Sequence, residues 1–247
     1  MSQRSGQTPP ESARPPRSRA GHAGRRSRWW WAGLGLVVAD MALVGGLAAE
    51  GSVLAQPGGT RYVIDVLLAL AGYVGAAIAL SAASASWAAT AHQVGVRFGL
   101  ITGAMWVVSL TVETFAGLTG WSNIAATGPL LLSGFALWGI AGARTRGRTD
   151  SVAAGALAAV YAEVTCVTLT IGFGFTLAYL ALPQLEHNID GSPEYLQSGW
   201  RNLHAFAIAN TFDAGFTHLL IAPIIATAVG TIGALAAGQR RAILDHH

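Results

Sequence analysis

The chain has 247 residues, of which 52% are apolar and only 11% are charged, with a mean hydropathy of +0.46. Soluble domains carry about 25% charged residues, so this chain cannot cover a water-facing surface with polar side chains. The apolar excess excludes a mainly disordered protein, and the single cysteine, Cys166, excludes a disulfide scaffold. The composition therefore predicts an all-α, polytopic membrane helix bundle.

Residues 1–28 form a tail rich in arginine and proline, which we expect to be disordered and cytoplasmic. Its basic residues are Arg4, Arg14, Arg17, Arg19, Arg25, Arg26 and Arg28. The tail either contacts anionic lipid head groups or only fixes the orientation of the chain. The rest of the sequence has no basic face or reading motif, so we do not expect nucleic acid as a partner.

Six apolar stretches then follow, each long enough to cross the roughly 30 Å hydrocarbon layer of a bilayer. The predicted spans lie near 29–49, 63–88, 98–119, 123–143, 152–182 and 205–237, within a transmembrane domain at 29–238. Residues 183–202 form a polar outer loop, and residues 239–247 form a cytoplasmic C-terminal tail. Gly172, Gly174 and Pro223 are the positions where the two longest spans would bend most easily.

Arginines in the connections predict the orientation. The connections on the side of the tail hold Arg97, Arg144, Arg146, Arg148, Arg240 and Arg241. The opposite connections hold only Arg61 and Arg201, together with acidic residues. By the positive-inside rule, both termini are cytoplasmic, in a bacterial-type inner membrane.

Ionisable residues inside the spans are the candidate functional residues, because a charge in mid-membrane is costly and needs a partner. The predicted polar cluster comprises Asp40, Glu113, Glu163, Asp213, His218 and Asn210. No arginine lies at a matching depth, so the acids must be protonated, bind cations, face water or pair with His218 and hydroxyl groups. Helical spacing places Trp106, Ser109 and Glu113 on one face of the third span.

The depth of these groups predicts a polar cavity open to the outside. Asp40, Glu163 and His218 lie near the midplane, whereas Glu113 and Asp213 lie in the outer half. We expect Glu163 to be protonated or cation-bound, and to exchange a proton with His218 if the two side chains meet. The alternative is that these residues only form interhelical hydrogen bonds.

Metal, cofactor and enzyme hypotheses receive little support. The chain lacks a His-x-x-x-His or Glu-x-x-His pair, and its glycine pairs, such as Gly172/Gly174, lie inside spans and predict helix packing. Ser133-Gly134 and His218 superficially resemble the serine and histidine of rhomboid proteases, but Leu131 replaces the first glycine of their Gly-x-Ser-Gly motif. We therefore predict no catalytic residue, no metal site and no cofactor.

The sequence leaves two functional hypotheses. In the first, intramembrane carboxylates bind or transport a small solute or cation, with protons as a coupling ion. In the second, the chain is a non-transporting scaffold or subunit of a larger membrane complex, held by its small-residue faces. The lipid bilayer is the only partner common to both hypotheses.

Overall fold

The structure is a computed structural model, and it describes residues 20–82, 87–118 and 120–244. Throughout these residues the chain folds into helices joined by short connections. The elements are α1 (Ala20–Glu50), the short 3-10 helix η1 (Val53–Ala55), α2 (Gly59–Ala82), α3 (Ala88–Phe115), α4 (Gly120–Thr149), α5 (Val152–Leu180), α6 (Leu182–Ile189), α7 (Pro193–Ser198) and α8 (Leu203–Leu244).

Five helices within the described residues are long and apolar enough to cross a membrane, namely α1, α3, α4, α5 and α8. Their length and composition are those of a membrane-embedded helical bundle, which agrees with the all-α prediction. The remaining long helix, α2, overlaps the second predicted span over residues 63–82, and residues 83–86 of that span lie outside the described part of the chain.

Several boundaries differ from those predicted. Helix α1 already begins at Ala20, within the predicted tail, while residues 1–19 lie outside the described part of the chain. The predicted connection before the third span is helical, because α3 begins at Ala88. At the other end, α8 continues through the predicted C-terminal tail as far as Leu244, and residues 245–247 lie outside the described part.

The predicted outer loop at 183–202 contains two short helices instead of irregular chain. Pro183 lies in the first turn of α6, where a missing backbone N–H costs nothing. The side chain of Ser192 caps α7 by accepting a hydrogen bond from the backbone N–H of Tyr195 at 3.2 Å.

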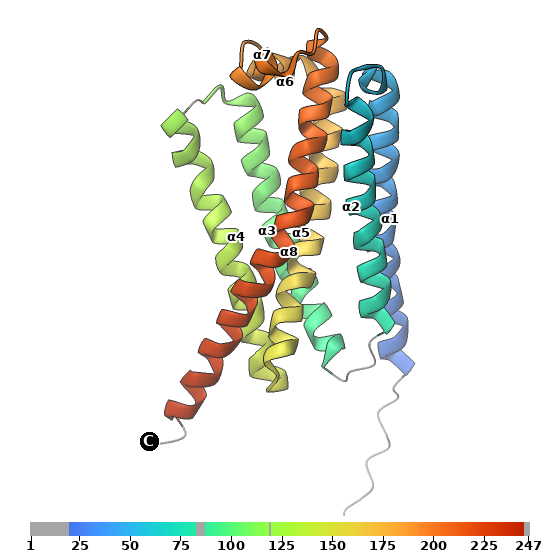
Figure 1. Cartoon of the computed structure of the whole chain (residues 1–247). Helices are drawn as coiled ribbons and strands as arrows, with labels where there is room; N and C mark the ends of the chain where they lie inside the picture. Colours follow the sequence, from blue (N-terminus) through green and yellow to red (C-terminus); the bar gives the residue numbers. More distant parts are fainter. Residues whose placement is uncertain (1–19, 83–86, 119, 245–247) are drawn as a thin grey trace, which may run out of the picture.

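The long helices run alternately up and down through the bundle (Figure 1). The start of α1 and the end of α8 lie at one end, and α6 and α7 lie at the other. Helix α5 is central and contacts α1, α3, α4 and α8. Its buried side chains join a core that includes Val44, Leu70, Phe175 and Phe212.

Glycines bring α4, α5 and α8 together in the half of the bundle away from α6 and α7. A Cβ atom on Gly142 of α4 would overlap the backbone carbonyl of Gly230 on α8, and one on Gly233 would overlap that of Gly139. Gly155 of α5 meets the same region of α4. Because the backbones touch there, this half of the bundle is closed, whereas α4 leans away from α3 and α8 at the other end (Figure 1).

The predicted glycine pairs contribute less to helix packing than expected. Gly172 contacts the carboxyl group of Asp40, but Gly174 has open space around its Cα. Gly46 likewise contacts Tyr179, whereas its neighbour Gly45 contacts nothing within 4 Å. Two glycines so close in sequence point to different sides of a helix, so one can meet a neighbouring helix while the other does not.

Helix α8 changes direction near its middle (Figure 1). Pro223 lies inside this helix, as the sequence predicted for a bend. Proline has no backbone N–H and its ring displaces the carbonyl group four residues earlier, which here belongs to Leu219.

Candidate functional site

A cavity of about 360 Å³ lies between α3, α4, α5 and α8. It occupies the half of the bundle nearer α6 and α7, because its lining includes Glu113 near the end of α3 and Thr211 near the start of α8. The polar residues that line it are Ser109, Glu113, Thr127, Thr170, Thr211 and His218, and the aromatic ones are Trp106 and Phe175. Its volume falls in the range of roughly 300–1,000 Å³ typical of small-ligand sites.

Helical periodicity explains how each wall forms. On α3, Trp106, Ser109 and Glu113 recur at intervals of three and four residues and therefore share a face. On α8, Thr211 and His218 lie two turns apart on one face. The grouping on α3 was predicted from the sequence.

Glu113 provides the carboxylate in the cavity wall. Its side chain is exposed, and Oε1 lies 3.5 Å from Nδ2 of Asn123 on α4. The ion pairs found among the described residues, Arg61–Asp65 and Glu186–His204, do not involve it. Within the described residues, no ion pair therefore involves this carboxyl group of the cavity wall.

A second set of polar residues, linked by hydrogen bonds, connects α2, α5 and α8. The Tyr73 hydroxyl oxygen lies 2.7 Å from Oε1 of Glu163 and 3.0 Å from the backbone carbonyl oxygen of Leu219. Glu163 is fully buried (0% exposed), and its Oε2 atom has no hydrogen-bond partner within the described part of the chain. Thr170 and Gly174 of the cavity wall lie seven and eleven residues further along α5, so Glu163 continues the same helical face beyond the cavity.

The polar cluster predicted from the sequence is thus divided. Glu113 and His218 line the cavity, Glu163 contacts Tyr73, and Asp40 is buried between α1 and Gly172 of α5 at 2% exposure. His218 does not pair with Glu163: its Nδ1 atom lies 2.7 Å from the carbonyl oxygen of Ala214.

Asn210 and Asp213 do not join either group, and their side chains are exposed on α8. As members of the predicted polar cluster, these two residues were expected to lie on an inward-facing side of the helix. Instead, the neighbouring face with Ile208, Ala209 and Phe212 is buried against the core, and apolar burial decides the rotation of the helix.

Tyr73 and Thr127 are site residues that sequence reasoning missed. A tyrosine in an apolar stretch does not by itself indicate a polar role. The available signal was Pro223, because a proline inside a helix leaves one backbone carbonyl without its helical donor, and a side chain such as that of Tyr73 can supply the missing hydrogen bond. Thr127 follows the start of α4 by two turns and had no charged neighbour to draw attention to it.

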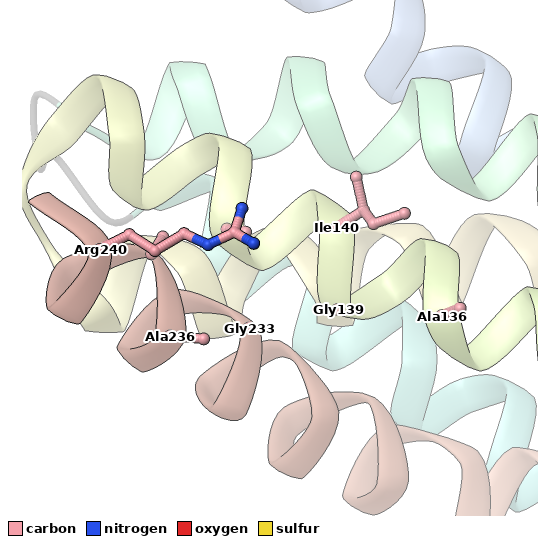
Figure 2. Close-up of a pocket in the computed structure, with 8 residues that line it drawn as sticks. Ala136, Gly139, Ile140, Gly233, Ala236 and Arg240 are labelled. Atoms are coloured by element: carbon pink, nitrogen blue, oxygen red, sulfur yellow. The ribbon is translucent and has the colours of Figure 1, made fainter.

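A second hollow lies between α4 and α8 at the closed end (Figure 2). It is lined by Ala136, Gly139, Ile140, Ala143, Gly233, Ala236, Ala237 and Arg240. Apart from the guanidinium group of Arg240, this lining offers no polar side chain (Figure 2). The cavity with Glu113 and His218 is therefore the better candidate for a functional site.

No group of three His, Cys, Asp or Glu side chains that could hold a metal ion occurs in the part of the chain that the structure describes. Comparison with protein-family models, curated proteins and solved structures finds no match to this chain. The function must therefore be argued from the cavity itself.

Proposed function

We propose that this chain is a six-span inner-membrane protein that binds and transports a small solute or cation through the cavity of Glu113 and His218. In this proposal α2 is the sixth span, and both ends of the chain are cytoplasmic. The arginine distribution supports this orientation, since Arg144, Arg146 and Arg148 lie in the last turns of α4, at the end that lies away from α6 and α7.

The observation that carries the proposal is the convergence of Glu113 and His218 on one cavity. Side chains from separate helices that only formed structural hydrogen bonds would meet one another directly, without leaving a cavity of about 360 Å³ between them. The cavity lies in the outer half of the proposed span, and the glycine contacts between α4 and α8 close the inner half. This arrangement is that of an outward-facing binding site.

Glu163 is the candidate for proton coupling. It lies beyond the cavity on the same face of α5, and its partner Tyr73 also contacts the bent part of α8 at Leu219. A change in the protonation of Glu163 would therefore alter a contact that holds the bend of α8, and α8 also carries His218 of the cavity wall. This coupling links the proton site to the shape of the binding site.

A second function is favoured by one observation on α8. Asn210, Asp213 and Thr217 lie on one face of this helix, and all three side chains are exposed. An exposed acid within a membrane span calls for a polar partner, as expected of a subunit in a larger complex. Asp213→Leu would disrupt assembly in that case, and blue-native electrophoresis of membranes would show the loss of the larger species.

The binding proposal is tested with the full chain in lipid nanodiscs. Gly174 lines the cavity and has open space around it, so Gly174→Leu fills the cavity. Gly45→Leu is the matched control, because Gly45 lies on α1 away from the cavity and also has open space. A panel of alkali cations, small amines and neutral solutes is screened for an increase in thermal stability.

We expect at least one solute to stabilise the wild-type chain and Gly45→Leu, but not Gly174→Leu. The same solute should enter proteoliposomes in response to a pH gradient, and Glu163→Gln should abolish this response. A panel without any stabilising solute, or stabilisation that persists in Gly174→Leu, would refute binding in the cavity.

A further inference from the structure

The hydrogen-bonding groups of the cavity wall are mostly acceptors. Three threonine hydroxyls donate their only proton to the carbonyl four residues earlier on their own helix: Thr127 to Asn123 at 2.9 Å, Thr170 to Cys166 at 2.9 Å, and Thr211 to Ala207 at 3.0 Å. Each hydroxyl oxygen keeps free lone pairs, which can only accept a hydrogen bond.

His218 adds a further acceptor. The carbonyl oxygen of Ala214 cannot donate, so the 2.7 Å contact places a proton on Nδ1 of His218. In the neutral tautomer that this contact selects, Nε2 carries a lone pair and can accept a hydrogen bond. The carboxylate of Glu113 accepts as well, and it adds the negative charge.

The donors in the wall are few. Ser109 contributes one hydroxyl, and the indole N–H of Trp106, which lies beside Gly134 of α4, has no hydrogen-bond partner within the described part of the chain. The remaining lining consists largely of apolar and aromatic side chains, including Leu110, Leu131 and Phe175. A ligand that satisfies this cavity must supply N–H or O–H donors, a positive charge and an apolar surface.

We propose that the ligand is a protonated primary or secondary amine that carries a compact apolar group. Its ammonium N–H groups donate to Glu113, to Nε2 of His218 and to the threonine oxygens, and its apolar group contacts Phe175 and the aliphatic side chains. This assignment rests on the proposed function and names its substrate class. A quaternary ammonium ion has the same charge but no N–H group, so it leaves these acceptors without a donor.

The test compares three probes on the full chain in nanodiscs of zwitterionic lipid, with empty nanodiscs subtracted. The probes are 2-phenylethylammonium, its N,N,N-trimethyl derivative and neutral 2-phenylethanol, and binding is measured by isothermal titration calorimetry. We expect 2-phenylethylammonium to bind most tightly, and the trimethyl derivative to bind about tenfold more weakly or worse.

Glu113→Gln should weaken binding of 2-phenylethylammonium by about tenfold or more and leave binding of 2-phenylethanol unchanged. Glu50→Gln is the matched control: it removes a carboxylate at the end of α1, outside the cavity lining, and should change neither affinity.

The outcomes separate this inference from the proposed function. Equal affinity for the primary and trimethylated ions would overturn the requirement for N–H donors while a cation site remained. An affinity for 2-phenylethylammonium that Glu113→Gln does not change would overturn the role of the carboxylate. If neither ammonium ion binds while another solute of the panel depends on the cavity, the amine class is wrong and the binding function stands.

Discussion

Tyr73 of α2 donates a hydrogen bond to the carbonyl oxygen of Leu219 on α8, at a distance of 3.0 Å. In a regular helix this carbonyl would accept from the backbone N–H of residue 223, but that residue is Pro223. The Tyr73 hydroxyl therefore replaces the hydrogen bond that the proline removes. The same hydroxyl oxygen lies 2.7 Å from Oε1 of Glu163, so Leu219 and Glu163 share its single proton unless Glu163 is itself protonated.

Removal of this hydroxyl should destabilise the bundle. In Tyr73→Phe the Leu219 carbonyl loses its donor inside the protein, at an expected cost of about 1–3 kcal/mol. Tyr62→Phe is the control on the same helix, because Tyr62 contacts Trp200 through its ring. Thermal unfolding in detergent, followed by circular dichroism, should show a lower Tm for Tyr73→Phe and little change for Tyr62→Phe. Equal Tm values for the two variants would contradict the role of the hydroxyl.

Pro223→Ala should reduce the cost of the Tyr73→Phe substitution. Alanine restores a backbone N–H four residues after Leu219, so the carbonyl has a helical partner and no longer depends on Tyr73. A double-mutant cycle over these two positions is expected to show a coupling of about 0.5–3 kcal/mol. Strictly additive changes in stability would mean that Pro223 and Tyr73 act independently.

Glu163 is expected to be protonated at neutral pH. The single proton of the Tyr73 hydroxyl has two acceptors in reach, Oε1 of Glu163 at 2.7 Å and the Leu219 carbonyl at 3.0 Å, and both hydrogen bonds form together only when Glu163 is protonated and donates to Tyr73. Protonation also leaves the unpartnered Oε2 as a neutral carbonyl oxygen in place of a buried charge. Infrared difference spectra between wild type and Glu163→Gln should contain a neutral carboxylic acid band, and the variant should keep its fold.

Asp40→Asn is the control for this band, because Asp40 is the other buried acid among the described residues. The neutral acid band assigned to Glu163 should persist in this variant. An ionised carboxylate band that depends on Glu163 at neutral pH, without added cations, would disprove the protonation.

The helical class was predictable because the membrane imposes it on long apolar segments, whatever their exact sequence. Long apolar segments must satisfy their backbone groups internally within a membrane, which requires helices. The exact boundaries were not predictable: α3 begins at Ala88, ten residues before the predicted span, and includes the polar residues His92, Gln93 and Arg97. Hydropathy marks the membrane-spanning part of a helix and carries no information on where its hydrogen bonds end.

The site was predictable one helix at a time. Spacing alone grouped Trp106, Ser109 and Glu113 on α3, because residues three and four apart share a face. Spacing could not decide which face of α8 turns inward, and so it joined Asp213 to the cluster although its side chain is exposed. Relations between helices, such as that between Tyr73 and Glu163, depend on how the helices pack, which a single sequence does not specify.

Gly172 and Gly174 of α5 should respond oppositely to alanine. A methyl group at Gly172 would overlap the carboxyl group of Asp40, so Gly172→Ala should cost about 1–3 kcal/mol. Gly174 has open space, and alanine there should be neutral or stabilise the helix by up to about 1 kcal/mol. Thermal unfolding of both variants distinguishes a specific contact with Asp40 from a general sensitivity of α5. A similar loss of stability in both variants would favour the general sensitivity.

The orientation of the bundle leads to a last prediction, on reporter fusions. The structure places the start of α1 and the end of α8 at one end of the bundle, and α6 and α7 at the opposite end (Figure 1). Arginines gather at the first end, where Arg144, Arg146 and Arg148 lie in the last turns of α4, so this end should be cytoplasmic. Alkaline phosphatase inserted near Gly191, between α6 and α7, should be active because it is exported, whereas fusions after Arg148 and Arg241 should be inactive. Green fluorescent protein at the same three sites should give the reverse pattern. Export of a reporter placed after Arg148 would show that the bundle has the opposite orientation, with the cavity of Glu113 and His218 open toward the cytoplasm.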